Sequence, residues 1–350
     1  MATQPQVGAA PLAVFVGRRQ ELGALETELE NVRAGRSRVV LVEGVAGIGK
    51  TALIERFLAP IDDLTVLRAS GDESERDLPF GVLEQLFRRA GERPALDGDH
   101  VTSGAQLLEL LGSLDDEHPI AVVIDDAHWA DAMSLRALLF VVRRLVADRV
   151  LIVIATRDAL ALPEGLVKAA ASDGSQIVLH PFTLDELRAL AEAGGVHLTA
   201  RAVHRLQAHA GGNPLHSRAL LDELPADAWH RQDNLPAPRS FAAIVRRRTA
   251  ACSPGAAALL EGVAILGPHG LLATAAELAD VDEPLDALEE AVSAGLLRVD
   301  ETRGVPAPAF AHPLIAAAVY DEIGPARRAR LHARAAELAE DEAPRLHHTD

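Results

Sequence analysis

The feature that most constrains this chain is a glycine-rich turn between an apolar run and a helical pattern. Residues 38–51 read RVVLVEGVAGIGKT and end in the pattern G-x-x-x-x-G-K-T. The run at 39–42 is aliphatic and β-branched, which is typical of a strand buried on both faces. Apolar residues at helical spacing follow Thr51. This order of strand, turn and helix predicts a phosphate-binding loop.

The residue types of this loop suit a nucleotide with Mg²⁺. Glycines let successive backbone N–H groups point at phosphate oxygens, and the helix N-terminus adds partial positive charge. We expect Lys50 to reach the β- and γ-phosphates of ATP or ADP, and the Thr51 hydroxyl to hold Mg²⁺. A chance glycine-rich turn is the alternative, and the flanking strand and helix count against it. The predicted nucleotide-binding residues of the loop are Gly44, Val45, Ala46, Gly47, Ile48, Gly49, Lys50, Thr51 and Ala52.

A second chemical anchor is a carboxylate pair at the end of a later apolar run. Residues 120–124 are typical of a buried strand, and Asp125 and Asp126 follow directly. P-loop enzymes hold the Mg²⁺ shell with a carboxylate at this edge of the sheet, and a neighbouring carboxylate can orient or deprotonate the attacking water. We therefore assign Asp125, with Thr51, to the metal and Asp126 to the water. The alternative is that the two acids only begin a turn.

Arg157 follows the next predicted buried strand, at 150–156. An arginine at this edge, beside Asp125, could sense the γ-phosphate, and an ion pair with Asp158 or another neighbour is the alternative. The catalytic residues expected from the sequence are Lys50, Asp125, Asp126 and Arg157.

Composition limits the partners of the chain. Of its 350 residues, 51 are acidic and 34 basic, which gives a net charge of −17 and makes it a poor candidate for gripping a nucleic-acid backbone by electrostatics. Cys252 is the only cysteine, which excludes an internal disulfide and fits a reducing cytoplasm. No secretory leader or long uncharged apolar run is present, so we expect a cytoplasmic protein without a membrane partner.

The pattern of apolar runs predicts an α/β fold with several domains. We expect a P-loop domain with a parallel sheet and crossover helices over 13–182. A small helical domain is expected over 183–235, and a winged-helix-like domain, with a β-wing after Leu297, over 236–340. Residues 1–12 are predicted to be disordered. Residues 341–350 are a tail or the start of further helical repeats.

The motifs together resemble the ATPase core of the large ATP-binding LuxR-type transcriptional regulators, which belong to the STAND class of AAA-related signal-transduction ATPases. The resemblance covers residues 14 to about 340. It is carried by FVGRRQEL at 15–22, GVAGIGKT at 44–51, GDESERDLPFGVLEQL at 71–86, VVIDDAHWAD at 122–131, ATRD at 155–158, GGNPL at 211–215 and FAHPLIAAAVYDEI at 310–323.

The resemblance implies a nucleotide-gated switch in which ADP locks a closed form and ATP permits homo-oligomerisation. It also implies roles for residues beyond the loop. Val16, Gly17 and Arg18 would line the adenine pocket. Pro214 would pack on the adenine, and His312 would touch the ADP β-phosphate. By itself, the break at 211–214 is explained as a helix corner, and a histidine such as His312 is typically a helix cap or a core residue.

Three functions remain open at this stage. The first is a regulatory switch with slow ATP hydrolysis, in a chain that ends where the sensor repeats and the LuxR-type helix-turn-helix of such regulators would follow. The second is a continuously cycling AAA-type ATPase that remodels a partner. The third is a DNA-binding winged-helix protein, which the acidic stretch at 282–295 and the net charge of −17 disfavour. We therefore expect DNA contact only through a helix-turn-helix that this chain lacks. The sequence does not identify an inducer.

Overall fold

The computed structural model describes residues 15–96, 98–114, 118–145, 148–172, 174–229, 235–267, 270–300 and 307–342. The expectations for 1–12 and for 343–350 lie outside these residues. The chain divides into two compact units, Met1–Pro181 and Phe182–Asp350, called unit 1 and unit 2 below. Within the described residues, no helix has the length and apolarity needed to cross a membrane.

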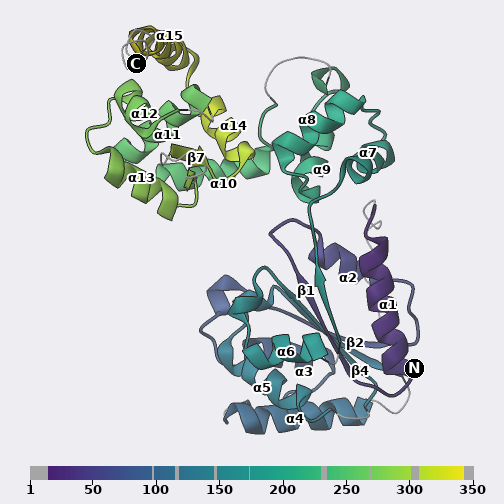
Figure 1. Ribbon diagram of the computed structural model, residues 1–350. Coiled ribbons are helices and arrows are strands. Elements are labelled where there is room, and N and C mark those ends of the chain that lie inside the picture. Colours follow the sequence, from purple (N-terminus) through teal and green to yellow (C-terminus); the bar gives the residue numbers. More distant parts are fainter. Residues whose placement is uncertain are drawn as a thin grey trace, which may run out of the picture. The chain divides into compact units, whose positions relative to one another are not determined.

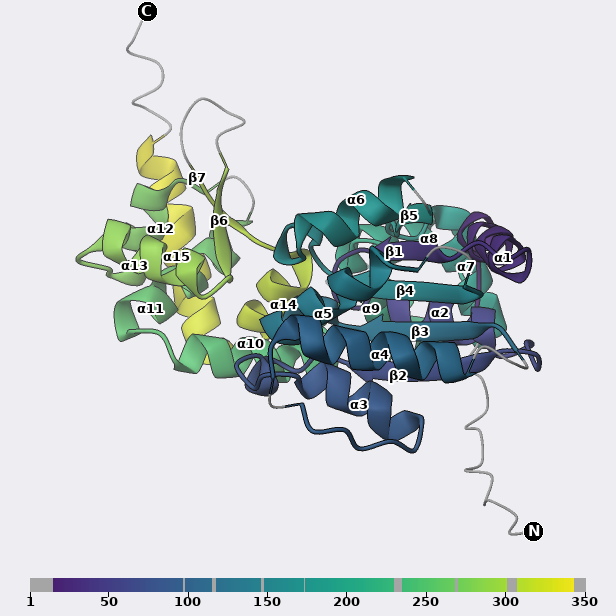
Figure 2. The same cartoon turned by 90° about the horizontal axis from the view of Figure 1, so that it is seen from below.

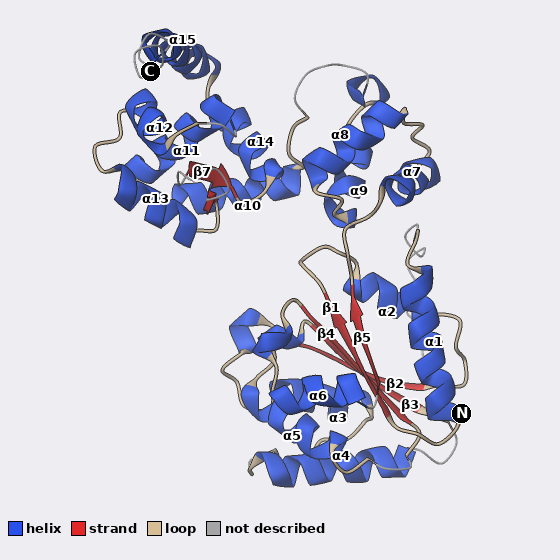
Figure 3. Cartoon of the chain, in the orientation of Figure 1, coloured by secondary structure: helices blue, strands red, loops and turns tan. Residues whose placement is uncertain are grey.

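Unit 1 is built on a parallel five-stranded sheet, which confirms the predicted α/β fold (Figures 1 and 3). The strand order is β2-β3-β4-β1-β5, and Figure 2 shows β1, β4 and β3 side by side. Valine, isoleucine and leucine fill the central strands on both faces, as expected for a parallel sheet covered by helices. The strands are β1 (Arg38–Glu43), β2 (Thr65–Ser70), β3 (Ile120–Asp125), β4 (Val150–Thr156) and β5 (Gly174–Val178).

Helices cover the two faces of this sheet. One core joins the sheet to α1 (Arg19–Arg33) and α2 (Lys50–Leu58). The other core joins it to the remaining helices of unit 1. These are α3 (Gly81–Arg89), α4 (His100–Leu114), α5 (Ala132–Val142) and α6 (Glu164–Ser172), with short 3-10 turns η1 (Glu73–Glu75), η2 (Ala127–Trp129) and η3 (Ala159–Ala161).

Local hydrogen bonds explain two helix boundaries. α4 begins at His100, because the Asp99 carboxylate accepts hydrogen bonds from the N–H groups of Val101 and Thr102 at 2.9 and 2.8 Å. α5 ends at Val142. The chain turns there through hydrogen bonds from the N–H groups of 143–145 to carbonyls of the last turn.

In its described residues, unit 2 consists of helices and a two-stranded antiparallel ribbon (Figure 3). Several of its helices begin at a side-chain cap: Thr183 and Glu186 form a capping box, and Asn213 and His312 cap later helices. The helices are α7 (Leu184–Ala193), α8 (Ala200–Ala210), α9 (Pro214–Glu223), α10 (Arg239–Ala250), α11 (Pro254–Leu266), α12 (Leu272–Ala279), α13 (Pro284–Ser293), α14 (Pro313–Glu322) and α15 (Pro325–Glu342), with the 3-10 turn η4 (Ala226–Trp229). The ribbon pairs β6 (Leu297–Asp300) with β7 (Ala307–Phe310).

Candidate nucleotide-binding site

The predicted phosphate-binding loop lies between the carboxyl end of β1 and the N-terminus of α2. Its backbone needs glycine at two points, since Gly47 and Gly49 have φ angles of 74° and 101°. Steric crowding requires a third glycine, because a Cβ atom added to Gly44 would lie 2.8 Å from Cγ2 of Ile48. Ile48 itself is buried and anchors the loop in the core. The sequence therefore makes a tight turn that opens onto a helix N-terminus, as phosphate binding requires.

Lys50 is buried at the base of this loop. Its Nζ donates hydrogen bonds to the carbonyl oxygens of Gly44 at 2.8 Å and Val45 at 3.3 Å. Burial lowers the pKa of Lys50, and the neighbouring charge of Arg157 adds to that, while Asp126 and Asp125 oppose it. Three charged residues predicted from other segments therefore act electrostatically on Lys50 in the folded chain.

Thr51 and Asp125 form a pair of oxygen ligands suited to Mg²⁺. The Thr51 hydroxyl donates to Oδ2 of Asp125 at 2.5 Å, so both oxygens face one point beside the loop. Mg²⁺ prefers oxygen ligands and is commonly held by one or two carboxylates together with substrate phosphates. When bound here, the ion would neutralise phosphate charge. The second oxygen of Asp125 accepts the Asp126 N–H at 2.9 Å, which fixes the carboxylate.

The segment Val16–Arg18 lies against the loop. Gly17 and Arg18 both have left-handed backbones, with φ of 70° and 60°. The Arg18 guanidinium is buried and donates to the carbonyls of Ile48 at 3.3 Å and His180 at 2.7 Å. This arginine therefore ties the start of α1 to the phosphate-binding loop and to the chain after β5. The contact agrees with the expectation that this segment borders the nucleotide, whose role there stays a prediction.

Arg157 lies directly after β4 and is exposed. The alternative of an ion pair with Asp158 is not seen, since the Asp158 carboxylate accepts the Leu160 N–H at 2.8 Å and caps η3. Among the described residues Arg157 forms no ion pair, and its charge acts on Lys50 and His128. The arrangement leaves its guanidinium available to a phosphate.

Pro214 and His312 belong to unit 2, where the structure brings their two segments together. Pro214 is the first residue of α9, after the Gly211–Gly212 turn. His312 caps α14 by accepting the Leu314 N–H at its Nδ1, 3.1 Å away. The His312 Nε2 lies 2.9 Å from the position of a Cβ on Gly211, so only glycine fits there.

Sequence reasoning missed three residues that shape the site in unit 1. The amide of Gln85 forms two 3.0 Å hydrogen bonds with the backbone N–H and carbonyl of Ser70, which fixes α3 on the end of β2. The buried Asp131 caps α5 and accepts the N–H groups of Phe80 and Val82. The sequence pattern D-x-x-S at 131–134 indicates that Asp131 caps a helix, but it does not indicate the hydrogen bonds to Phe80 and Val82. His128, the third, is nine-tenths buried beside Asp126.

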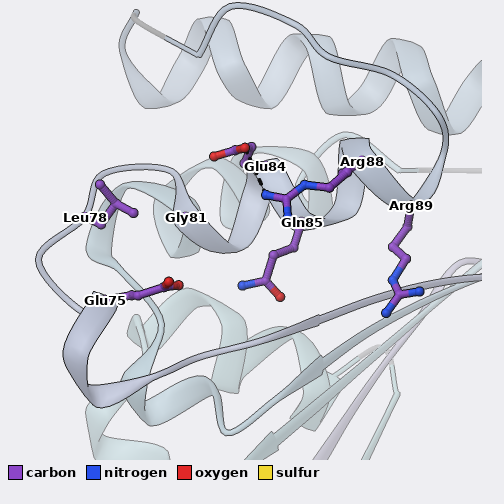
Figure 4. Close-up of a pocket in the computed structure, with 7 residues that line it drawn as sticks. All are labelled: Glu75, Leu78, Gly81, Glu84, Gln85, Arg88 and Arg89. Carbon is purple, nitrogen blue, oxygen red and sulfur yellow. Dashed lines mark hydrogen bonds and ion pairs between the residues drawn. The ribbon is translucent and has the colours of Figure 1, made fainter.

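Two cavities meet at Gln85 and Arg89. One, of about 200 Å³, also borders Thr51 and Asp125. The other, of about 530 Å³, lies along α3 and is seen in Figure 4. In that view the Arg88 side chain turns to Glu84, with which it pairs at 2.9 Å, whereas Arg89 points away from it. The two cavities therefore border, in turn, the expected metal site and the outer face of α3.

Comparison with known families supports this geometry. Residues 14–154 match the family described as AAA ATPase domain. This part of unit 1 is an AAA-type ATPase domain. The match includes the phosphate-binding loop, Asp125 and Asp126, and it ends shortly before Arg157.

Solved structures share the fold at low sequence identity. The Aeropyrum pernix Orc1 protein, solved in complex with DNA, matches with 17% identity and a TM-score of 0.51, over 90% of this chain and 95% of its own. Cdc6p from Pyrobaculum aerophilum matches with 13% identity and a TM-score of 0.51, over 97% of each chain. These likenesses show the fold alone. A comparison with curated proteins found no match.

Proposed function

We propose that the chain is the ATP- and ADP-binding switch module of a LuxR-type transcriptional regulator, with slow Mg²⁺-dependent ATP hydrolysis. Nucleotide binding rests on the loop, on buried Lys50 and on the hydrogen bond between Thr51 and Asp125. In the hydrolytic step, Lys50 and Arg157 would stabilise charge on the phosphates. Asp126 would orient or deprotonate the attacking water.

The observation that carries the switch is the contact between two distant segments of unit 2. The turn of GGNPL packs against the FAHPL segment, with His312 against Gly211. These are the two segments that the family resemblance assigns to the nucleotide. Each begins a helix with proline, α9 at Pro214 and α14 at Pro313, and helix N-termini favour phosphate. The His312 Nδ1 accepts a backbone N–H, which places the ring proton on Nε2. The ring also forms a hydrogen bond with the backbone of Ala210, which a phosphate would have to replace.

The order of α11, α12, α13, β6 and β7 supports a winged-helix assignment within unit 2. The helix in the recognition position, α13, has the sequence PLDALEEAVS, and it lacks basic residues. Such a helix would repel DNA phosphates, so we assign the winged helix to nucleotide control rather than to DNA contact. In the ATP state the module would expose surface for homo-oligomerisation.

The experiment is to identify the nucleotide that the purified chain releases on denaturation. The informative variant is His312→Asn, because asparagine can still cap α14 but lacks the Nε2 donor. We expect about one ADP per wild-type chain and several-fold less in His312→Asn. His204→Ala, on the exposed side of α8, is the control and should keep its ADP.

A second function fits the AAA family match equally well, namely a continuously cycling ATPase that remodels a partner. It predicts that the wild-type chain is purified without nucleotide, turns over added ATP freely, and is indifferent to His312→Asn. That set of results would replace the switch with the cycling enzyme.

A further inference from the structure

The turn that follows Asp125 is held in one conformation. Asp126 has a left-handed backbone, with φ of 44°, and its carbonyl accepts the Trp129 N–H at 2.8 Å. Gly71 packs directly on this turn, since a Cβ there would lie 2.6 Å from both the Asp126 carbonyl oxygen and the Ala130 nitrogen. His128 therefore has a fixed place behind Asp126.

His128 carries an unmet hydrogen-bonding capacity. Its side chain is 9% exposed, whereas that of Asp126 is 40% exposed. Neither ring nitrogen has a hydrogen-bond partner among the described residues, and both are shielded from solvent. Leaving a buried polar group unpaired costs about 1–3 kcal/mol. We therefore expect the His128 ring to have a hydrogen-bond partner in another conformational state of the protein.

The geometry identifies that partner. The His128 Nε2 lies 3.9 Å from Oδ1 of Asp126, so a movement of about 1 Å would make a hydrogen bond. Burial, and then the charge of Arg157, lower the pKa of His128, which keeps the ring neutral near pH 7. A neutral ring has one N–H to donate and leaves the full negative charge on Asp126. That carboxylate is also partly exposed, and its charge acts on Lys50 of the phosphate-binding loop.

We propose that His128 is a positioning residue, whose Nε2–H donates to the Asp126 carboxylate and holds it toward the attacking water. This role rests on the ATP hydrolysis proposed above. The role requires a hydrogen-bond donor at the Nε2 position, and the imidazole stays neutral throughout. His128 affects hydrolysis only through Asp126. Nucleotide binding, which depends on Lys50, Thr51 and Asp125, does not require it.

The test uses three substitutions that separate packing from donation. His128→Phe keeps a ring of similar volume without a donor. His128→Gln places an amide N–H near the former Nε2, and His128→Asn places one near the former Nδ1. We expect kcat for ATP hydrolysis to fall about 10- to 100-fold in the Phe and Asn variants, and to stay within about threefold of wild type in the Gln variant. ATP affinity should not change in any of them.

Two controls complete the experiment. His118→Gln, at the opposite end of β3 and exposed, should leave kcat unchanged. In the double variant Asp126→Asn/His128→Phe, the second change should have no further effect, because His128 acts through Asp126. Additive losses, or equal rates in the Phe and Gln variants, would overturn the proposal. A wild-type chain that binds ATP but never hydrolyses it would instead overturn the proposed function.

Discussion

Lys50 illustrates how the fold sets the chemistry of a single residue. Its ammonium is buried by the strand before it and the helix that it begins, and its hydrogen-bond partners among the described residues are two neutral carbonyl oxygens. Burial lowers its pKa, and the charges of Asp126 and Asp125 offset this only in part, so the folded chain holds the ammonium at a cost. A bound phosphate would supply further negative charge.

Lys50→Met should therefore have opposite effects on stability and on binding. We expect the nucleotide-free variant to melt at or above the wild-type temperature, because no buried charge remains. ATP affinity should fall about 10- to 150-fold, the value of a lost hydrogen bond to a charged group. Differential scanning fluorimetry and titration calorimetry measure the two effects, and a variant that melts lower and binds ATP normally would contradict this view of Lys50.

Because burial lowers the pKa of histidines in unit 2, we expect the folded protein to lose stability in acid. Burial lowers the pKa of His216 from 6.5 to about 4, and His312 lies against it with ring centroids 5.7 Å apart. The unfolded chain binds a proton at His216 below pH 6.5, whereas the folded chain binds it only near pH 4. Stability is therefore full above pH 6.5 and is lost as the pH falls toward 4.

For His216 we expect about 1–2 kcal/mol of this loss, a value reduced because the ring is half exposed. His216→Phe should keep the edge contact with Phe241 and remove this share of the acid sensitivity. Protonation of His312 would also end its cap on Leu314, so some sensitivity should remain. Thermal unfolding at pH 7 and pH 5 measures the difference, and an equal pH effect in variant and wild type would argue against the assignment.

At the scale of elements, close backbone approach decides which turns are possible. Gly71 follows β2 and touches the turn after Asp125, whereas a Cβ added to Gly23, in α1, would meet no atom within 4 Å. Gly71→Ala should destabilise unit 1 by about 1–3 kcal/mol through overpacking. Gly23→Ala should instead stabilise it by about 0.5–1 kcal/mol, because alanine is the better helix former. Chemical denaturation of both variants tests the contrast, and similar effects would contradict it.

Elements and residues differ in how far the sequence alone could predict them. The loop, its strand and its helix follow from local patterns, and Asp125 and Asp126 follow because parallel strands end at one edge of a sheet. Gln85 and Asp131 could not be predicted in their roles, since each pairs with backbone groups that are distant in sequence. The turn that carries His128 likewise packs on Gly71, a residue distant in sequence that follows β2.

At the scale of the molecule, the division of the chain at Pro181 predicts that unit 1 can fold and bind nucleotide without unit 2. Unit 1 contains the loop, both carboxylates and Arg157, with cores of its own on both faces of the sheet. Residues 1–181 should therefore fold alone and bind ATP. Titration calorimetry of the purified fragment with ATP tests this statement, and a folded fragment that does not bind ATP would contradict it.

The central claim is that Thr51 and Asp125 hold Mg²⁺ on a nucleotide bound by the loop. The most direct measurement is calorimetric titration of the full chain with ATP, with and without Mg²⁺, in wild type and in Asp125→Asn. We predict that Mg²⁺ tightens ATP binding to the wild type and that this gain is lost in the variant, whose Mg²⁺-free affinity stays close to that of the wild type. The same Mg²⁺ gain in both proteins, or no binding of ATP to the wild type, would contradict the account.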